Sequence, residues 1–349
     1  MSMQTWRVIE RQLETAPDAL KRVHCLKLVG AMEWAPGDWF LVRPTNPDKV
    51  VEDVLQALAL TGKEVIQLRR VGEMTAIEAL KRHLEITQLD PAVLNRLQRQ
   101  HGIGAWPDRA AMAAYANRRS VLDLLCDWPQ VRQLGRALLP LLSLLAPRFY
   151  SIASSPLVSP GEIHLLFAEV IYRACGRTYC GAATHMMAQL EPDDTLVGQV
   201  QANQHFRLPD KGDVPIVMIG AGVGLAPFMG FIAHRIAQGG GGENWLFFGE
   251  AHRDKTFLCR AQLERWAAAG QLKLVTAFSR DQVQKIYVQH RLQAYGDDLM
   301  RLVEAGAYLY LCGDKQCMAP AVLETLSQIL GDEGLAALKA ENRLKLDVF

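Results

Sequence analysis

The sequence predicts a β-barrel that is interrupted by an all-helical insert and followed by an α/β domain with a doubly wound parallel sheet. Three observations predict this fold class. Residues 6–43 alternate short strand-like segments with turns. Apolar residues then recur at helical spacing from about residue 50 to residue 140. After residue 213, short apolar segments are each followed by a helical stretch, which is the βα repeat of a parallel sheet.

The expected elements of the barrel lie on both sides of the helical insert. The turn formed by Ala35, Pro36, Gly37 and Asp38 leads into a strand. The strands expected for the barrel cover residues 6–9, 23–29, 39–42, 149–153 and, with looser alternation, 162–172. The barrel domain is therefore expected to be discontinuous, over residues 1–50 and 140–212.

The helical insert is expected over residues 51–139. Thr75 is a candidate N-cap for a helix over residues 76–84, and Glu78 follows at capping-box spacing. Asp90 and Pro91 open the next helix, with proline at the first helical position. Further helices are predicted over residues 50–58, 121–126 and 131–139.

The α/β domain is expected over residues 213–349. A helix entered through a small-residue turn, residues 181–190, precedes it. Strands are predicted over residues 214–219, 244–249, 273–277 and 307–311. The chain end, residues 346–349, has the composition of an ordinary frayed terminus when taken alone.

Charge and composition exclude several classes of protein. Lys and Arg number 38 against 37 Asp and Glu, which is not the basic surplus of a general nucleic-acid binder. Residues 214–233 form the longest apolar stretch, but their glycines and prolines make them unsuitable for a membrane helix. Residues 1–10 do not resemble a signal peptide. The seven cysteines are scattered without metal-site spacing, so we expect a reduced, cytoplasmic protein without a metal site.

The first candidate site is a glycine turn, with Gly220, Gly222 and Gly224 between an apolar strand and a helix. Glycines allow a tight turn and let backbone N–H groups approach a pyrophosphate. Any strand–helix turn can carry such a triplet, and no acidic residue is obviously placed for a ribose. Taken alone, the turn leaves phosphate binding and plain packing equally open.

A second segment follows a predicted strand and offers groups that suit a ribose 2′-phosphate. Its hydroxyl, guanidinium, ammonium, aromatic ring and amide belong to Ser279, Arg280, Lys285, Tyr287 and Gln289. Arginine is a good planar partner of phosphate. The alternative is a solvated charged loop.

Three further segments carry chemistry. Arg148 and Tyr150 share one face of a strand that continues through Ser151. Gly181, Ala182, Ala183 and Thr184 stand at a helix start, where phosphate binds favourably. Cys312 and Asp314 follow the last predicted strand, at the edge where α/β sheets place their ligands. The ordinary alternatives are a plain strand for the first segment, a packed turn for the second and a buried thiol for the third.

In this order, the segments resemble the ferredoxin–NADP reductase superfamily. The similarity is greatest to its diflavin-reductase branch, which includes the sulfite reductase flavoprotein subunit and NADPH–cytochrome reductase. Residues 148–155, 277–289, 310–314 and 347–349 resemble the motifs of that branch, and residues 84–87 resemble its connecting domain. The resemblance covers nearly the whole chain.

The resemblance implies FAD in the barrel and NADPH on the parallel sheet. FAD would be held by Arg148, Tyr150, Ser151, Ile152, Ala153, Tyr172, Gly181, Ala182, Ala183, Thr184 and Phe349. NADPH would contact Gly220, Gly222, Gly224, Ser279, Arg280, Lys285, Tyr287, Gln289, Cys312 and Asp314. The catalytic group would be Ser151, Cys312, Asp347 and Phe349, with Phe349 stacked on the flavin until the nicotinamide displaces it.

The sequence departs from the branch in three ways. The branch normally carries an FMN-binding domain before the barrel, and nothing here precedes Met1, so a separate acceptor protein is expected. Met229 and Phe349 stand where relatives often have arginine and a larger aromatic. We expect an NADPH-dependent reductase that serves a flavodoxin-like, haem or sulfite-reductase-type acceptor, with no nucleic-acid partner. The alternatives are a flavin-binding sensor module and a reductase of free flavin or ferric complexes.

Overall fold

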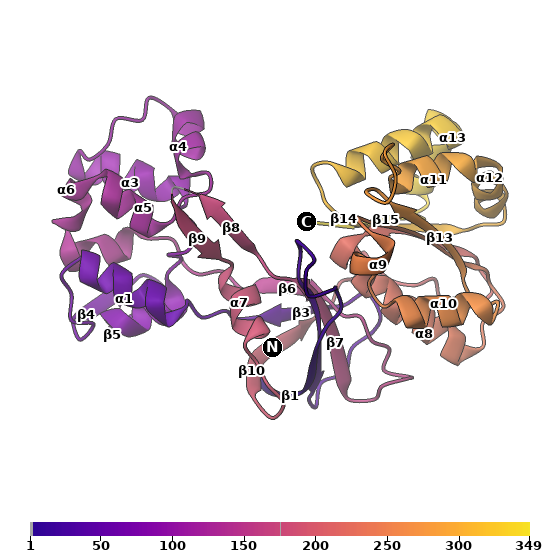
Figure 1. The fold of residues 1–349 in the computed structure, drawn as a ribbon, viewed down its shortest axis with the longest axis horizontal. Coiled ribbons are helices and arrows are strands. Elements are labelled where there is room, and N and C mark those ends of the chain that lie inside the picture. Colours follow the sequence, from indigo (N-terminus) through magenta and orange to yellow (C-terminus); the bar gives the residue numbers. More distant parts are fainter. Residues whose placement is uncertain (1–2, 175) are drawn as a thin grey trace. The chain divides into compact units, whose positions relative to one another are not determined.

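The computed structural model describes residues 3–174 and 176–349 (Figure 1). Met1, at the expected start, and Cys175, one of the thiols, lie outside the described residues. The chain divides into two compact units. The first contains Met1–Leu41, Phe149–Ala168 and Leu190–Phe349, and the second contains Val42–Arg148 and Glu169–Gln189.

The first unit contains an antiparallel sheet in which strands far apart in sequence alternate. Its order is β6 (Arg148–Ser151), β3 (Trp39–Val42), β10 (Thr195–Gln201), β1 (Gln4–Leu13), β2 (Val23–Val29) and β7 (Glu162–Ala168). A bridge between Ile152 and Leu165 joins the two edge strands and closes the barrel. Trp6 and Phe40 are buried inside, with their rings edge to face at 5.2 Å. The expected barrel is confirmed, although β10 was missed.

The second sheet of this unit is fully parallel. Its order is β13 (Lys273–Phe278), β12 (Asn244–Glu250), β11 (Ile216–Ala221), β14 (Tyr308–Gly313) and β15 (Leu344–Val348). One face packs against α8 (Ala226–Gln238) and α10 (Arg260–Ala268). The other packs against α11 (Val288–Ala294), α12 (Gly296–Glu304) and α13 (Met318–Ala340), as Figure 1 shows. The doubly wound sheet is therefore confirmed, and β15 shows that the chain end is a strand.

The second unit carries its helices on a core of its own, and the helix over Arg109–Ala116 was not predicted. They are α1 (Asp48–Ala57), α2 (Ala76–Glu78), α3 (Pro91–His101), α4 (Arg109–Ala116), α5 (Val121–Asp127) and α6 (Pro129–Arg132), with a π-turn at Ala79–His83. Thr75 Oγ1 accepts the N–H of Glu78 at 3.4 Å, and Asp90 accepts the N–H of Ala92 at 2.8 Å. Both caps were predicted from the sequence.

Some local predictions for the second unit were wrong. The insert is not helical throughout, because β4 (Val65–Leu68) and β5 (Gly72–Thr75) form a hairpin. The helix expected over residues 131–139 gives way to a 3-10 segment, Gly135–Leu141, since Gly135 has a φ of +50°.

In the first unit, the strand expected over residues 162–172 stops at Ala168. After that stop, β8 (Ile171–Ala174) pairs with β9 (Arg177–Cys180), and α7 (Ala182–Ala188) follows. The three-domain division, with boundaries near residues 50, 140 and 212, stays a prediction. Among the described residues, no helix combines the length and apolar character needed to cross a membrane. The described cysteines are free thiols: Cys25, Cys126, Cys180, Cys259, Cys312 and Cys317.

Candidate functional site

A cleft of about 660 Å³ opens at the carboxyl end of the parallel sheet. Strand ends of such sheets are where α/β proteins place their ligands. The turns after β11, β12, β13 and β14 all reach it, as does the loop between β1 and β2. Its walls include Lys21, Gly222, Glu250, Ser279, Tyr287, Gln289, Asp314 and Phe349.

The three glycines of the first turn have different roles. Only Gly222 lines the cleft, and it has the left-handed φ of +57°. A Cβ on Gly224 would lie 2.2 Å from the carbonyl oxygen of Cys312, so this glycine lets the turn pack against β14. A Cβ on Gly220 would lie 2.8 Å from the ring of Phe228. Met229 is buried on α8 and is not among the cleft residues.

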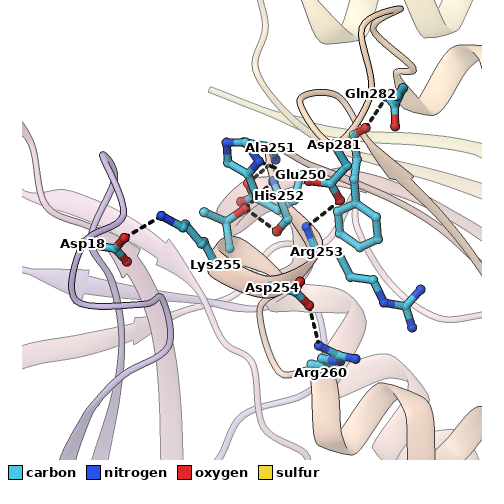
Figure 2. Close-up of polar contacts among 12 residues, drawn as sticks. Asp18, Glu250, Ala251, His252, Arg253, Asp254, Lys255, Arg260, Asp281 and Gln282 are labelled. Carbon is cyan, nitrogen blue, oxygen red and sulfur yellow. Dashed lines mark hydrogen bonds and ion pairs between the residues drawn. The ribbon is translucent and has the colours of Figure 1, made fainter.

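The segment after β13 is held in place by its main chain and by neighbouring side chains. The N–H of Ser279 donates to Glu250 O at 2.9 Å, and that of Arg280 to Ala251 O at 2.8 Å. Figure 2 shows Asp281, which belongs to this segment. Its carboxylate accepts the N–H of Arg253 at 2.9 Å and lies 3.1 Å from His252 Nδ1. These contacts fix where the segment leaves the sheet.

The side chains of this segment divide into two groups. Ser279, Tyr287 and Gln289 line the cleft. Arg280 and Lys285 are exposed, and their side chains make no hydrogen bond or ion pair with any described residue. Arg280 and Lys285 adjoin the cleft residues Ser279 and Ile286 in sequence, and their part in binding an anionic ligand stays a prediction.

Ser151, Cys312 and Asp347 come from three strands of two sheets and lie together. Ser151 Oγ donates to Asp347 Oδ2 at 2.8 Å. Cys312 and Asp347 are partners across the parallel pair β14–β15. Trp39 Nε1, which the sequence did not single out, lies 3.2 and 3.3 Å from the two oxygens of Asp347.

Burial dominates the electrostatics of this cluster. It raises the pKa of Asp347, while the hydrogen bonds from Ser151 and Trp39 oppose that rise. The fully buried Cys312 has a pKa well above that of an ordinary thiol, mainly through burial and further through Asp347. Cys312 is therefore a neutral thiol beside a carboxylate that two donors hold in one orientation.

Phe349 and Asp314 adjoin this cluster. The N–H of Phe349 donates to Gly313 O at 3.1 Å, and the N–H of Lys315 donates to Phe349 O at 3.0 Å. The terminal backbone is thereby fixed, while the Phe349 side chain, 64% exposed, lines the cleft. Asp314 accepts the N–H of Cys317 at 2.5 Å, and this bond lowers its pKa. Its carboxylate thus caps the start of α13.

Along β6 and just beyond it, the candidate residues differ in what they can offer a ligand. The Tyr150 ring packs edge to face on Phe167 at 6.4 Å. Ile152 and Ala153 are buried, and their N–H groups donate to Asp38 O and His164 O at 3.0 and 2.8 Å. Their side chains and N–H groups therefore serve the barrel, which leaves only carbonyl groups for a ligand.

In the second unit, an acidic residue orients Arg148. Arg148 Nη2 lies 3.1 Å from Glu85 Oε2, and Nη1 donates to Ala146 O at 2.6 Å. Glu85 is nearly buried, and its other oxygen accepts from the backbone and hydroxyl of Thr87. Glu85 belongs to the segment 84–87 that resembles the connecting domain, so the sequence did contain a signal for it.

The remaining candidates of the second unit lie on and after the β8–β9 hairpin. The rings of Tyr172 and Tyr179 stack at 5.1 Å. The hydroxyl of Thr184 donates to Gly181 O at 3.3 Å and accepts the N–H of Val170 at 3.2 Å, so it closes the turn. Ala182, Ala183 and Thr184 begin α7, where N–H groups have no intrahelical acceptor. What these residues can offer an anion is therefore their backbone N–H groups.

Comparisons with known proteins match this chain to two cofactor-binding domains. Residues 218–324 match the oxidoreductase NAD-binding domain, and residues 94–186 match an FAD binding domain. The flavoprotein alpha-component of NADPH sulfite reductase from Serratia proteamaculans is 35% identical over 334 residues, which is 91% of this chain and 55% of that protein. The same component from Bacillus subtilis is 35% identical over 344 residues, covering 93% of this chain and 57% of that protein. The chain thus spans about half the length of the curated relatives it matches.

Proposed function

Because this chain belongs to the ferredoxin–NADP reductase superfamily, we propose that it binds FAD, oxidises NADPH and passes the electrons to a separate acceptor protein. The single observation that carries the proposal is the 2.8 Å hydrogen bond between Ser151 and Asp347, with Cys312 paired beside them. That cluster joins the barrel strand to the nucleotide-side sheet. It adjoins a cleft, and Arg280 and Lys285 stand next to two of the cleft residues in sequence.

The residues present fit both cofactors. Arg280 and Lys285, which have no partner among the described residues, suit a phosphate, and Tyr287 offers a ring for adenine. We assign Tyr150, Ser151 and Phe349 to the flavin ring, and Arg148, Tyr172 and Gly181–Thr184 to the rest of FAD. When bound, FAD supplies the chemistry that accepts a hydride and releases electrons to one-electron carriers.

The chain's own residues position the reacting groups and stabilise the charge that develops between them. Ser151 and Trp39 hold the Asp347 carboxylate in one orientation, so it presents a fixed negative charge to a ring that becomes positive. Cys312, neutral and fully buried, excludes water beside that carboxylate. The Phe349 side chain covers the cleft on a fixed backbone. Positioning of this kind supplies much of the rate when two reactants need only be brought into contact.

Anaerobic stopped-flow absorbance tests the proposal. NADPH is expected to bleach the yellow holoprotein in a fast phase, and reoxidation is expected to require an added acceptor protein. Slow bleaching would instead support a flavin-binding sensor. Fast turnover with free flavin or ferric complexes alone would support a reductase of small acceptors.

The class of acceptor follows from the relatives. Their printed names make them components of an NADPH-dependent sulfite reductase. We propose a flavodoxin-like, haem or sulfite-reductase-type acceptor, and we place the protein in the cytoplasm because its described cysteines are free thiols. The expected domains, 1–50 with 140–212, 51–139 and 213–349, belong to the same proposal.

Lys21 is expected to contribute to nucleotide affinity. It lies on the barrel loop that reaches the cleft, and a Cβ on Gly222 would be 3.4 Å from its ammonium nitrogen. Lys21→Ala should raise the Kd of NADP⁺ by about threefold to tenfold at low salt, and by less at high salt, because the charge is exposed and screened. Titration calorimetry measures this, with Lys63→Ala in the second unit as the control. An unchanged Kd at low salt contradicts the assignment.

Phe349 is expected to weaken discrimination against NADH, because a phenyl ring is more easily displaced from a flavin than a larger indole. Phe349→Trp should therefore raise the ratio of kcat/KM for NADPH over NADH by roughly threefold or more. Steady-state kinetics with both nucleotides measure the ratio. Equal ratios in the two proteins would show that the terminal ring has no part in selectivity.

A further inference from the structure

Glu250 is a carboxylate in the cleft that the mechanism above does not use. It is the last residue of β12, the strand beside β11 and its glycine turn. Its Oε2 accepts the N–H of Ala251 at 2.8 Å. Its Oε1 faces the turn, since a Cβ on Gly222 would lie 3.6 Å from it. One carboxylate oxygen therefore lies where the turn offers its backbone to a phosphate.

Lys21 reaches the same glycine from the barrel loop. The loop is fixed by Lys255 on α9 (Arg253–Thr256), whose ammonium lies 2.5 Å from Asp18 (Figure 2) and whose carbonyl accepts the N–H of Ala16 at 2.8 Å. Lys21 and Glu250 thus bring opposite charges to the same place beside Gly222. An incoming pyrophosphate would be attracted by the Lys21 ammonium and repelled by the Glu250 carboxylate.

We propose that Glu250 takes up a proton from solvent when a pyridine dinucleotide binds, so that it sets a pH-dependent affinity of the cleft. The proposal rests on the nucleotide-binding function proposed above. In the protonated form, the carboxyl O–H donates to a phosphate oxygen, whereas the ionised form opposes the same oxygen with like charge. A proton is gained and no bond to the nucleotide is broken.

The groups around Glu250 define the sign of the effect. Lys21 faces it from the barrel loop and His252 from its own loop, while Tyr287, Asp314 and Cys317 line other walls of the cleft. Burial raises the pKa of Glu250 in the free protein, and the Ala251 N–H and Lys21 oppose that rise. A bound phosphate raises the pKa further. Affinity is therefore full below the free-state pKa and falls as pH rises toward the bound-state pKa.

Titration calorimetry of the FAD-loaded protein with NADP⁺ tests the proposal. Runs in buffers of different ionisation enthalpy, between about pH 5 and pH 8, give the number of protons taken up at each pH. Glu250→Gln replaces the carboxyl with a neutral amide that can still donate. We expect it to remove up to about one proton of uptake and to bind NADP⁺ about threefold to tenfold more tightly at the upper end of the range. The 2′-phosphate also titrates, but it does so equally in both proteins.

Glu243→Gln is the matched control, because Glu243 precedes β12 at the opposite end and pairs with Arg301. It should leave Kd and proton uptake unchanged. Weaker binding by Glu250→Gln would overturn the proposal, since it would make the carboxylate a ribose-hydroxyl acceptor. Unchanged Kd and proton uptake would overturn it as well. If wild type binds no NADP⁺ at all, the nucleotide function fails first, and that result is distinct from either.

Discussion

Replacing Asp347 with asparagine is expected to slow the reduction of FAD by NADPH by about 100-fold to 1,000-fold, the loss typical when one fixed group that stabilises developing charge is removed. The amide keeps the size of the carboxylate and can still meet Ser151 and Trp39. It loses the negative charge. The effect should appear in the rate of hydride transfer more than in the Kd of NADP⁺, because the charge matters most as the nicotinamide becomes positive.

The pH profile adds a second measurement on the same variant. Burial raises the pKa of Asp347, and the active form is the ionised one. As the pH falls, the rate of hydride transfer in the wild type should therefore decrease at a higher pH than the pKa of an ordinary aspartate would predict. Asp347→Asn should lack this decrease. Asp298→Asn, a half-exposed carboxylate in the first turn of α12, is the control. A variant that retains wild-type rates across this range rules out the catalytic assignment of Asp347.

Arg280→Ala is expected to raise the KM for NADPH by about 10-fold to 100-fold and to change the KM for NADH little. The guanidinium has no partner among the described residues, while its main chain is fixed by Ala251 O. The planar guanidinium loses less conformational freedom per hydrogen bond formed with the 2′-phosphate than a flexible ammonium does. Because NADH lacks that phosphate, the loss should fall on one nucleotide only.

Steady-state kinetics with both nucleotides measure this change in preference. Arg265→Ala, on the exposed face of α10, is the matched control. Lys285→Ala should shift the preference in the same direction but by less, since a single ammonium lacks the bidentate geometry. Equal losses for NADPH and NADH would mean that Arg280 does not face the 2′-phosphate.

Much of the fold was predictable because local pattern and tertiary structure agree. The strand over residues 39–42 and the caps Thr75 and Asp90 follow from alternation and capping chemistry. The hairpin β4–β5 and the strands β10 and β15 were missed. β4, β5 and β15 are short, and β15 is a strand only because β14 is free to pair along its edge. Such pairing depends on long-range neighbours that no local window contains.

The candidate site was predictable where residues follow strand ends in parallel order. Ser279, Tyr287, Cys312 and Asp347 fall at one edge of the sheet for that reason. Lys21, Trp39 and Glu250 could not be found in this way. Lys21 and Trp39 belong to the barrel, and their approach to the nucleotide-side sheet depends on how two sheets pack. No local pattern singles out Glu250, because its importance depends on the position of its carboxylate beside Gly222.

The hydrogen bonds from Ser151 and Trp39 to Asp347 limit how the two sheets can be exchanged between related proteins. One possible chimaera would exchange the carboxyl-terminal half alone. Here such a swap would import a foreign aspartate against resident donors on β3 and β6. A working hybrid therefore has to carry those two strands along with the imported half. The contacts that orient the aspartate lie between the two sheets rather than within either sheet.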